Sequence, residues 1–269
     1  MQAFPALKNI PSNYLGLVQR TSAVIRAAAS LMAFDLLATR AGAIVLDHQP
    51  ATITALSPTG PYRVSCPAGT YWARRLILCP GAWANQVLLP FDLQLNLAIW
   101  QMTVAYFPAD ATRYAYPLWY EFGHIQGDNQ GLFYGFPPDE FPGLIKVSAD
   151  FTSTVYTSPE QCTYKPDPTL LAMIQAFLAQ RFNDVGSAPA HATTCLYTMS
   201  SDSQMILDCL PGFANVAIFA GDSGRGFKFT PLFGRILVEL ATTGTTSYAI
   251  APFSITRPGI LKEAAPPCD

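Results

Sequence analysis

Four segments of the chain are predicted to be helices, and two of them place their hydrophobic residues on one helical face. Residues 24–41 are rich in alanine and leucine and are followed by Gly42, a common helix stop. A short helix is predicted over 83–89. In the segments 168–182 and 229–243 the apolar residues fall on one face, which predicts two amphipathic helices.

The ends of two of these helices carry recognisable signals. Asp167 stands at an N-cap position before the helix at 168–182, and Pro168 suits its first helical residue. The last helix has Thr230–Pro231 in its first turn and Gly244 as its stop. These signals predict helix boundaries as well as helix positions.

Between the helices, alternating or continuous apolar runs bounded by Gly, Pro and Ser predict short strands. The predicted strand regions are 43–57, 61–66, 70–81, 95–107, 131–136, 143–151, 194–199, 204–208 and 214–220. Residues 108–167 are aromatic and rich in Pro and Gly, and only two of the predicted strands fall there. No internal repeat is found.

Strands alternate with helices at both ends of the chain, whereas the middle is rich in strands. This order predicts a mixed α/β (α+β) fold, in which a mainly antiparallel β domain is inserted into an α/β layer. We expect the inserted domain to comprise residues 1–33 and 96–200, and the α/β layer to comprise 34–95 and 201–269.

Composition narrows the possible partners. Half of the 269 residues are apolar, 13% are charged and the formal net charge is −2, without a dense basic block. We therefore expect neither nucleic acid nor a membrane as a partner. The sequence shows no signal-peptide pattern and no peroxisomal C-terminal tripeptide, so we expect a cytoplasmic protein.

The six cysteines do not form a Cys-x-x-Cys pair, and only three histidines are present. A zinc site is therefore not expected, and each thiol has to be considered alone. Cys195 alternates with Tyr197 along a predicted strand, so both side chains point to one face and could line a pocket. The alternative is a small buried thiol beside a packed tyrosine.

The stretch "FAGDSGRGFKFTPLFG" (219–234) predicts a strand, a glycine-rich turn and a helix. Such a turn lets a ligand approach backbone N–H groups at the start of a helix, and Lys228 adds a full positive charge. A carboxylate, a phosphate or an electron-rich carbonyl would be stabilised there. The alternative is an ordinary turn with a lysine that extends to solvent.

Lys146 stands inside the predicted strand at 143–151. A lysine in the interior of a sheet needs a partner or a task, because burying an unpaired ammonium is costly. The alternative is an edge-strand lysine that prevents aggregation.

Six segments, in this order and spacing, resemble the sarcosine oxidase family of the glycine/D-amino-acid oxidase group. They are "ILCPGAW" (77–83), "YGFP" (134–137), "GLIKVSAD" (143–150), "CLYTMSSDSQMILD" (195–208), "GDSGRGFKF" (221–229) and "FSITRP" (253–258). The resemblance implies an FAD-dependent oxidation of an N-alkyl amino acid, with O₂ as the acceptor and hydrogen peroxide as a product.

The resemblance also implies roles for individual residues. Cys195 matches a thiol that bonds the flavin, Lys146 a lysine that promotes oxygen reduction, and Lys228 a lysine that binds the substrate carboxylate. Tyr134 and Tyr197 match residues around the substrate. Lys228 is implied to contact FAD as well, and the remaining positions implied to contact FAD are Ala51, Gly81, Trp83, Gly224, Arg225, Gly226 and Phe227.

Three departures from the family pattern bear on this expectation. Asp150 and Arg225 stand where the family often has histidine, and the sequence contains no GxGxxG segment, which would hold the FAD pyrophosphate. We therefore expect an N-terminally truncated FAD oxidase, monomeric unless another chain completes it. The alternative is an inactive remnant that cannot hold FAD alone.

Overall fold

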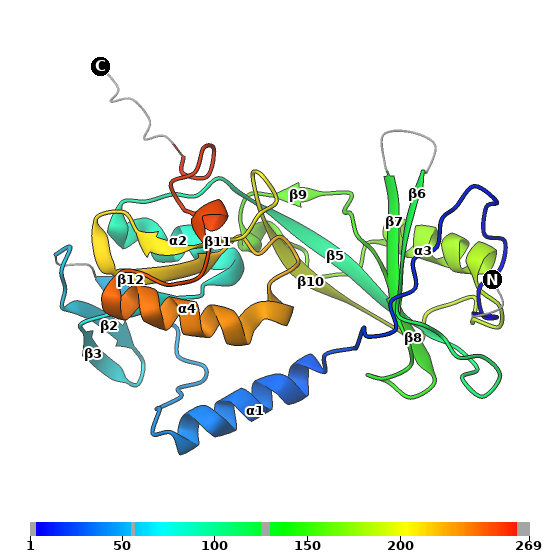
Figure 1. Cartoon of the computed structure of the whole chain (residues 1–269), viewed down its shortest axis with the longest axis horizontal. Helices are drawn as coiled ribbons and strands as arrows, with labels where there is room; N and C mark the ends of the chain where they lie inside the picture. Colours follow the sequence, from blue (N-terminus) through cyan, green and yellow to red (C-terminus); the bar gives the residue numbers. More distant parts are fainter. Residues whose placement is uncertain (1–3, 55–56, 125–129, 263–269) are drawn as a thin grey trace. The chain divides into compact units, whose positions relative to one another are not determined.

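The computed structural model describes residues 4–54, 57–124 and 130–262. The chain divides into two compact units. Unit 1 comprises residues 1–26, 100–155 and 162–196, and unit 2 comprises residues 27–99, 156–161 and 197–269. The mixed α/β fold class expected from the sequence is confirmed, and each unit is described below by itself (Figure 1).

Unit 1 is built on a six-stranded sheet with the order β10-β5-β8-β7-β6, in which β9 also pairs with β5. The strands are β5 (Leu97–Pro108), β6 (Trp119–His124), β7 (Gln130–Phe136), β8 (Leu144–Ala149), β9 (Val155–Tyr156) and β10 (His191–Ser200). Neighbours β5, β8, β7 and β6 are antiparallel, with Tyr106 opposite Lys146 and Phe136 opposite Lys146 in register. The inserted antiparallel layer expected from the sequence is therefore present.

One face of this sheet is covered by helix α3 (Pro168–Arg181) and forms the core of unit 1. Phe107, Phe133 and Val147 point to this core from three strands, and Ile174 and Leu178 meet them from the helix. Alternation along the strands sends the intervening side chains to the opposite face. That opposite face carries Tyr106, Tyr134, Lys146 and Cys195, and it is called the Lys146 face below.

Helix α3 begins where the sequence predicts. The Asp167 carboxylate accepts hydrogen bonds from the backbone N–H groups of Thr169 and Leu170, at 2.7 and 3.3 Å. Pro168 occupies the first turn. The short 3₁₀ helix η3 (Pro159–Gln161) precedes α3, in the part of the chain that belongs to unit 2.

Unit 2 contains a three-stranded sheet with the order β11-β12-β4. β11 (Ile206–Leu210) and β12 (Phe213–Ala220) form an antiparallel pair, and β4 (Leu76–Leu78) lies parallel to β12. Helix α4 (Thr230–Thr243) packs on this sheet through Phe233, Ile236 and Leu240. The parallel pair with a covering helix is the α/β element expected from the sequence.

The other elements of unit 2 are one helix of 14 residues, α1 (Ala27–Arg40), and several short helices and strands. The short elements are β1 (Thr52–Thr54), β2 (Tyr62–Cys66), β3 (Gly69–Ala73), α2 (Ala84–Leu88), η1 (Gly81–Trp83), η2 (Leu89–Phe91), η4 (Phe227–Phe229) and η5 (Ala251–Phe253). Strands β1, β2 and β3 form a separate antiparallel sheet.

Two expectations about strands were wrong. Residues 43–51 form no strand; Ile44 and Val45, which suggested one, are 84% and 56% exposed. Residues 55 and 56 of that predicted strand lie outside the described residues. Strand β6 lies in the aromatic, Pro-rich region where no strand was predicted, because its pairing with β7 outweighs a weak local pattern.

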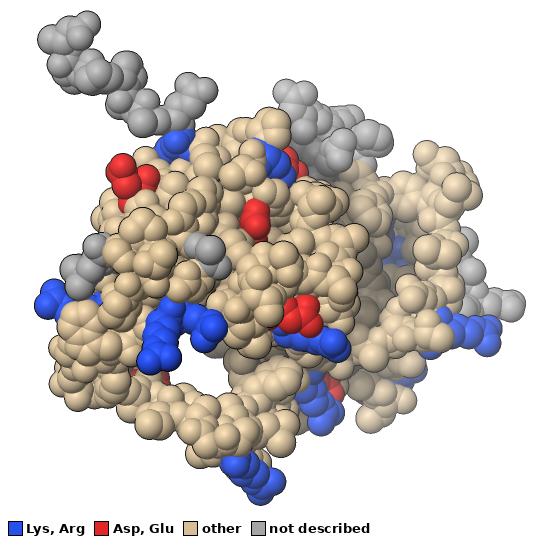
Figure 2. Space-filling model, turned by 60° about the vertical axis from the view of Figure 1, so that its left-hand side comes forward, with Lys and Arg blue, Asp and Glu red and all other residues tan. Residues whose placement is uncertain are grey.

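Helix α1 has no buried residue, although it carries Leu31, Met32, Phe34, Leu36 and Leu37. Such a group of exposed apolar side chains is typical of a surface that packs against another polypeptide segment. On the face of the molecule shown in Figure 2, basic and acidic side chains are interspersed on a mainly uncharged surface. Among the described residues, no helix is both long and apolar enough to cross a membrane.

Candidate functional site

Lys146 lies in the interior of the unit 1 sheet, because β8 is flanked by β5 and β7. The edge-strand interpretation of this lysine is therefore wrong. Its Nζ is 3.1 Å from Oε2 of Glu140, in the turn that connects β7 to β8, and its side chain is 30% exposed. The ammonium also lies 5.6 Å from the ring centroid of Tyr106 and 5.7 Å from that of Phe136.

Tyr106 is buried beside this ion pair and donates its hydroxyl to the same Glu140 oxygen at 2.8 Å. Burial raises the pKa of the Tyr106 phenol, and the hydrogen bond to Glu140 raises it further. Burial alone would raise the pKa of Glu140, but the hydrogen bonds from Tyr106 and Lys146 outweigh it and lower that pKa. The three side chains thus form one hydrogen-bonded group with an ionised carboxylate at its centre.

Cys195 is exposed on β10, so the interpretation of a small buried thiol is wrong. Cys195 and Tyr134 both lie close enough to Tyr106 to contribute to the raised pKa of its phenol. The structure therefore brings three of the predicted site residues, Tyr134, Lys146 and Cys195, to one face of one sheet. Exposure leaves the thiol accessible to an electrophile.

An aromatic group continues the Lys146 face toward the sheet edge. The Tyr134 ring is stacked with the Tyr120 ring at 6.1 Å between centroids and an interplanar angle of 12°. Tyr120 also contacts Phe122 and donates its hydroxyl to Asp150, the residue that stands in place of a family histidine. Flat, partly exposed rings and a carboxylate suit an organic ligand with a cationic group.

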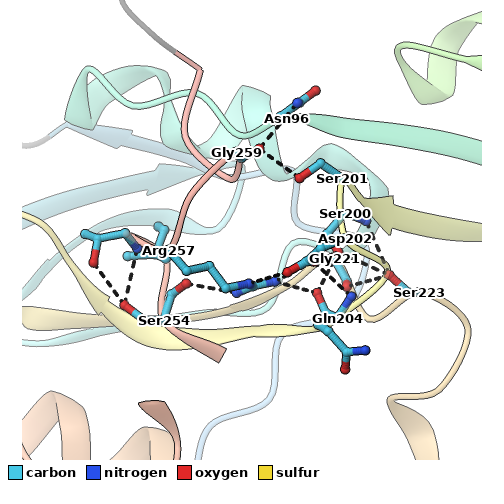
Figure 3. A network of polar contacts seen from close by, with 12 residues as sticks. Asn96, Ser200, Ser201, Asp202, Gln204, Gly221, Ser223, Ser254, Arg257 and Gly259 are labelled. Atoms are coloured by element: carbon cyan, nitrogen blue, oxygen red, sulfur yellow. Dashed lines mark hydrogen bonds and ion pairs between the residues drawn. The ribbon is translucent and has the colours of Figure 1, made fainter. Parts of the chain in front are cut away.

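In unit 2, the glycine-rich turn at 221–226 is tied to the last residues of β10, 197–200, which belong to this unit. Asp222 forms an isolated bridge with Met199, and Ser223 N–H donates to the Thr198 carbonyl at 3.0 Å. The Ser223 hydroxyl donates to the Gly221 carbonyl at 3.1 Å and accepts from the Ser200 N–H at 3.3 Å (Figure 3). These bonds hold the turn against residues 198–200 of β10.

Tyr197 and Gly224 are brought into direct contact. A Cβ built on Gly224, whose φ is +75°, would lie 2.5 Å from Cε2 of the Tyr197 ring. Burial raises the pKa of the Asp222 carboxyl nearby, although the Gly226 N–H donates to it at 3.4 Å. Of the predicted residues that follow, Arg225 and Lys228 are exposed and Phe227 is half-buried.

The remaining predicted contacts also belong to unit 2. Gly81 and Trp83 form η1, directly after β4, and Gly81 has a φ of +55° with nothing within 4 Å of its Cβ position. Trp83 Nε1–H donates to Glu160 at 3.0 Å. Ala51 is exposed and precedes β1, which belongs to a different sheet from β4 and β12.

Sequence reasoning did not single out Glu140, Tyr106, Ser223 or Asp202. Asp202 binds Arg257 through two guanidinium nitrogens, at 2.7 and 3.0 Å, and Arg257 also donates to the carbonyls of Gln204 and Ser254 (Figure 3). This network joins the turn between β10 and β11 to the segment at 253–259. Asp202 and Arg257 lie in the quoted segments "CLYTMSSDSQMILD" and "FSITRP", so the sequence pointed to both segments but not to this pair.

A hollow of about 420 Å³ lies elsewhere in unit 2, lined by Asp208, Tyr248, Ala249, Ile250, Ala251 and Ser254. None of the predicted site residues lines it. The Asp208 carboxylate there accepts hydrogen bonds from the Ser254 hydroxyl and the Ile255 N–H, which is a structural task. Within the described part of the chain, no group of three or more His, Cys, Asp or Glu side chains could hold a metal ion.

The described residues thus place an exposed thiol, an ammonium paired with a carboxylate and aromatic rings on one sheet face of unit 1, and a β–turn–α unit in unit 2. The sequence profile of the DAO family, described as FAD dependent oxidoreductase, matches residues 2–240. The chain belongs to this family. Its sarcosine oxidase-like character, expected from the six segments, is confirmed by the relatives described next.

The chain is 32% identical over 266 residues to the peroxisomal sarcosine oxidase of Homo sapiens, covering 95% of this chain and 65% of the relative. It is 29% identical to the monomeric sarcosine oxidase of Bacillus sp. (strain NS-129), again covering 95% and 65%. It thus spans about 65% of the length of these relatives. The N-methyl-L-tryptophan oxidase of Salmonella agona is 27% identical, with 96% and 67% covered.

Solved structures agree with these relatives. The open form of NikD, described as an unusual amino acid oxidase essential for nikkomycin biosynthesis, superposes with a TM-score of 0.75 and 26% identity. The superposition covers 84% of this chain and 59% of NikD. Glycine oxidase from Geobacillus kaustophilus shares the fold, with a TM-score of 0.66 at 19% identity over 84% of this chain and 56% of that enzyme.

Proposed function

We propose that the chain carries the substrate-facing part of an FAD-dependent oxidase of N-alkyl amino acids. In this reaction the secondary amine loses two electrons and two protons and becomes an imine, which water hydrolyses. Dioxygen gains the two electrons and two protons and leaves as hydrogen peroxide. FAD, when bound, supplies the redox chemistry that links the two halves.

The observation that carries this proposal is the composition of the Lys146 face. An apolar core covers one side of the unit 1 sheet, whereas the other side presents Lys146, Tyr134 and an exposed Cys195. A sheet face of this kind, with a nucleophile, a cation and flat rings, fits the isoalloxazine end of FAD. The open space at the Cβ position of Gly81 in unit 2 is compatible with a closely bound group.

Each residue has a proposed task. Cys195 would hold the flavin through a thioether, whose formation breaks the thiol S–H and one flavin C–H bond and passes two electrons and two protons to dioxygen. Lys146 would stabilise the negative charge that dioxygen gains. Lys228 binds the substrate carboxylate through a charge-assisted hydrogen bond. Tyr134 and Tyr197 contact the substrate, and Ala51, Gly81, Trp83 and the turn residues Gly224, Arg225, Gly226 and Phe227 contact the cofactor.

The expected domain division also remains a proposal. Residues 1–33 and 96–200 would face the substrate, and residues 34–95 and 201–269 would face FAD. The inactive-remnant alternative is not favoured, since the family match extends over residues 2–240.

The pyrophosphate end of FAD needs a part of the enzyme beyond the residues discussed above. The sequence has no GxGxxG segment, and the chain spans about 65% of the length of its sarcosine oxidase relatives. We propose that polypeptide outside these 269 residues supplies this part. The exposed apolar residues of α1 are in keeping with a covering segment.

An oxidase assay tests this function. The polypeptide that contains these residues would be supplied with FAD and air, and peroxide would be measured with sarcosine, N-methyl-L-tryptophan, pipecolate and a fructosyl amino acid. Peroxide formed with at least one N-alkyl amino acid, in equal amount to the amine consumed, is the expected result. A flavin-loaded protein that oxidises none of them would contradict the proposal.

A further inference from the structure

Glu140 is the acidic partner of Lys146, and it lies outside every segment on which the family resemblance rests. It belongs to the turn between β7 and β8, and its side chain is 55% exposed. One carboxylate oxygen, Oε2, accepts both the Lys146 ammonium at 3.1 Å and the Tyr106 hydroxyl at 2.8 Å. The buried phenol therefore anchors a carboxylate that would otherwise move with the turn.

The neighbouring side chains restrict the position of the Lys146 ammonium. The ring centroids of Tyr106 and Phe136 lie 5.6 and 5.7 Å from Nζ, so the side chain runs between two aromatic rings. At its end it meets the carboxylate. Two opposite charges in contact largely cancel each other's field at a third group, whereas a lone ammonium attracts a nearby anion with its full charge.

We propose that Glu140 is a positioning residue for Lys146, which holds the ammonium and offsets its charge, and thereby limits how fast dioxygen reacts at the Lys146 face. The oxygen part of this inference rests on the proposed function. Dioxygen takes up two electrons from the reduced cofactor and two protons, and it gains negative charge before the protons arrive. An ammonium shared with a carboxylate stabilises that charge less than an unshared one.

The ion pair itself can be tested without flavin. Trinitrobenzenesulfonate is an anionic reagent for amines, and peptide masses report how fast each lysine reacts. In Glu140→Gln, we expect Lys146 to react roughly three- to tenfold faster relative to Lys165, because a repelling and obstructing carboxylate is gone. Glu140→Asp should give an intermediate rate. An unchanged rate in Glu140→Gln would overturn the claim that Glu140 holds Lys146.

The oxygen effect is measured on the flavin-loaded protein by stopped flow, with reduction by substrate and reoxidation by air followed separately. Glu140→Gln should raise the rate constant for reoxidation by about tenfold, which corresponds to about 1.4 kcal/mol. Glu239→Gln is the matched control, because it removes an ion pair of the same length, 3.1 Å, from helix α4. It should leave reoxidation unchanged.

The outcomes separate the two levels of the inference. If Glu140→Gln speeds up both the labelling of Lys146 and the reoxidation of the flavin, the result supports both claims: that Glu140 holds Lys146 and that it limits the reaction with dioxygen. Faster labelling with unchanged or slower reoxidation overturns the limiting effect on oxygen. A protein that takes up no flavin contradicts the proposed function, and the labelling rates still decide whether Glu140 holds Lys146.

Discussion

The Tyr197 ring lies so close to the backbone of Gly224 that a Cβ on this glycine would be 2.5 Å from Cε2 of the ring. The glycine also has a φ of +75°, which L side chains rarely adopt. Close packing and backbone conformation therefore both require glycine here. The contact fixes the turn against the strand that carries Tyr197.

Gly224→Ala should destabilise unit 2, because the methyl group must push the tyrosine ring aside and the backbone is strained. We expect the free energy of unfolding to fall by about 2 kcal/mol, seen as a lower urea midpoint. Gly234→Ala is the matched control. Gly234 lies inside helix α4 with nothing within 4 Å of its Cβ position, so this change should be neutral or stabilising by up to about 1 kcal/mol. Equal effects of the two changes would contradict the packing described.

The Asp202–Arg257 ion pair should make the free energy of unfolding depend on pH in the acidic range. The hydrogen bond from Arg257 is the main cause that lowers the pKa of Asp202 well below its ordinary value of 3.8. A carboxyl whose pKa is lowered by folding contributes stability that is fully present above its unfolded pKa and is lost as pH falls toward the folded pKa. At neutral pH, the free energy of unfolding should therefore be larger for the wild-type protein than for Asp202→Asn. The difference between the two proteins should become smaller as the pH falls below the ordinary carboxyl pKa.

Urea midpoints measured from neutral to acidic pH test this dependence. Asp47→Asn serves as the control, since the Asp47 side chain is 87% exposed, and it should change the midpoint little at any pH. A gap between wild type and Asp202→Asn that stays constant as the carboxyl protonates would show that the ion pair contributes nothing to folding.

Lys228 should govern recognition of the substrate carboxylate. Losing a charge-assisted hydrogen bond costs about 1.5–3 kcal/mol, so Lys228→Met should raise KM for an N-methyl amino acid by roughly ten- to a hundredfold. An N-methyl amine without a carboxylate should be oxidised equally well by both proteins. Lys165→Met, which alters another exposed lysine, is the control. If Lys228→Met kept the preference for the carboxylated substrate, another group would have to bind it.

The helices could be predicted from the sequence because their signals are local. Asp167 was expected as an N-cap, and its carboxylate does accept the Thr169 and Leu170 N–H groups. Such a cap depends only on residues within one turn. The same is true of Gly244, which ends α4 with a φ of 75°.

Strands depend on distant partners, and here the sequence was less informative. Ile44 and Val45 have a strand-like pattern, but among the described residues no strand pairs with this segment. β6 has a weak pattern but pairs with β7 along six residues. Backbone N–H and C=O groups need partners, and a single sequence does not indicate which segments will supply them.

The candidate site shows the same contrast. Lys146 and Cys195 could be singled out because a lysine inside a strand and a thiol alternating with a tyrosine are unusual in themselves. Glu140 could not, because its importance comes from the β7–β8 turn, which brings its carboxylate to 3.1 Å from Nζ of Lys146. Acidic residues in turns are common, and nothing in the local pattern distinguishes this one.

Peptide mapping of the native flavoprotein is the most direct test of the proposed flavin site. The polypeptide containing these residues would be purified from its own cells, precipitated with acid, digested and examined by mass spectrometry. We expect the peptide that contains Cys195 to carry covalently bound flavin, and Cys195→Ala to release all flavin fluorescence into the acid supernatant. An unmodified Cys195 peptide from a protein that contains FAD would contradict attachment at this thiol, and a protein without any flavin would contradict the proposed oxidase.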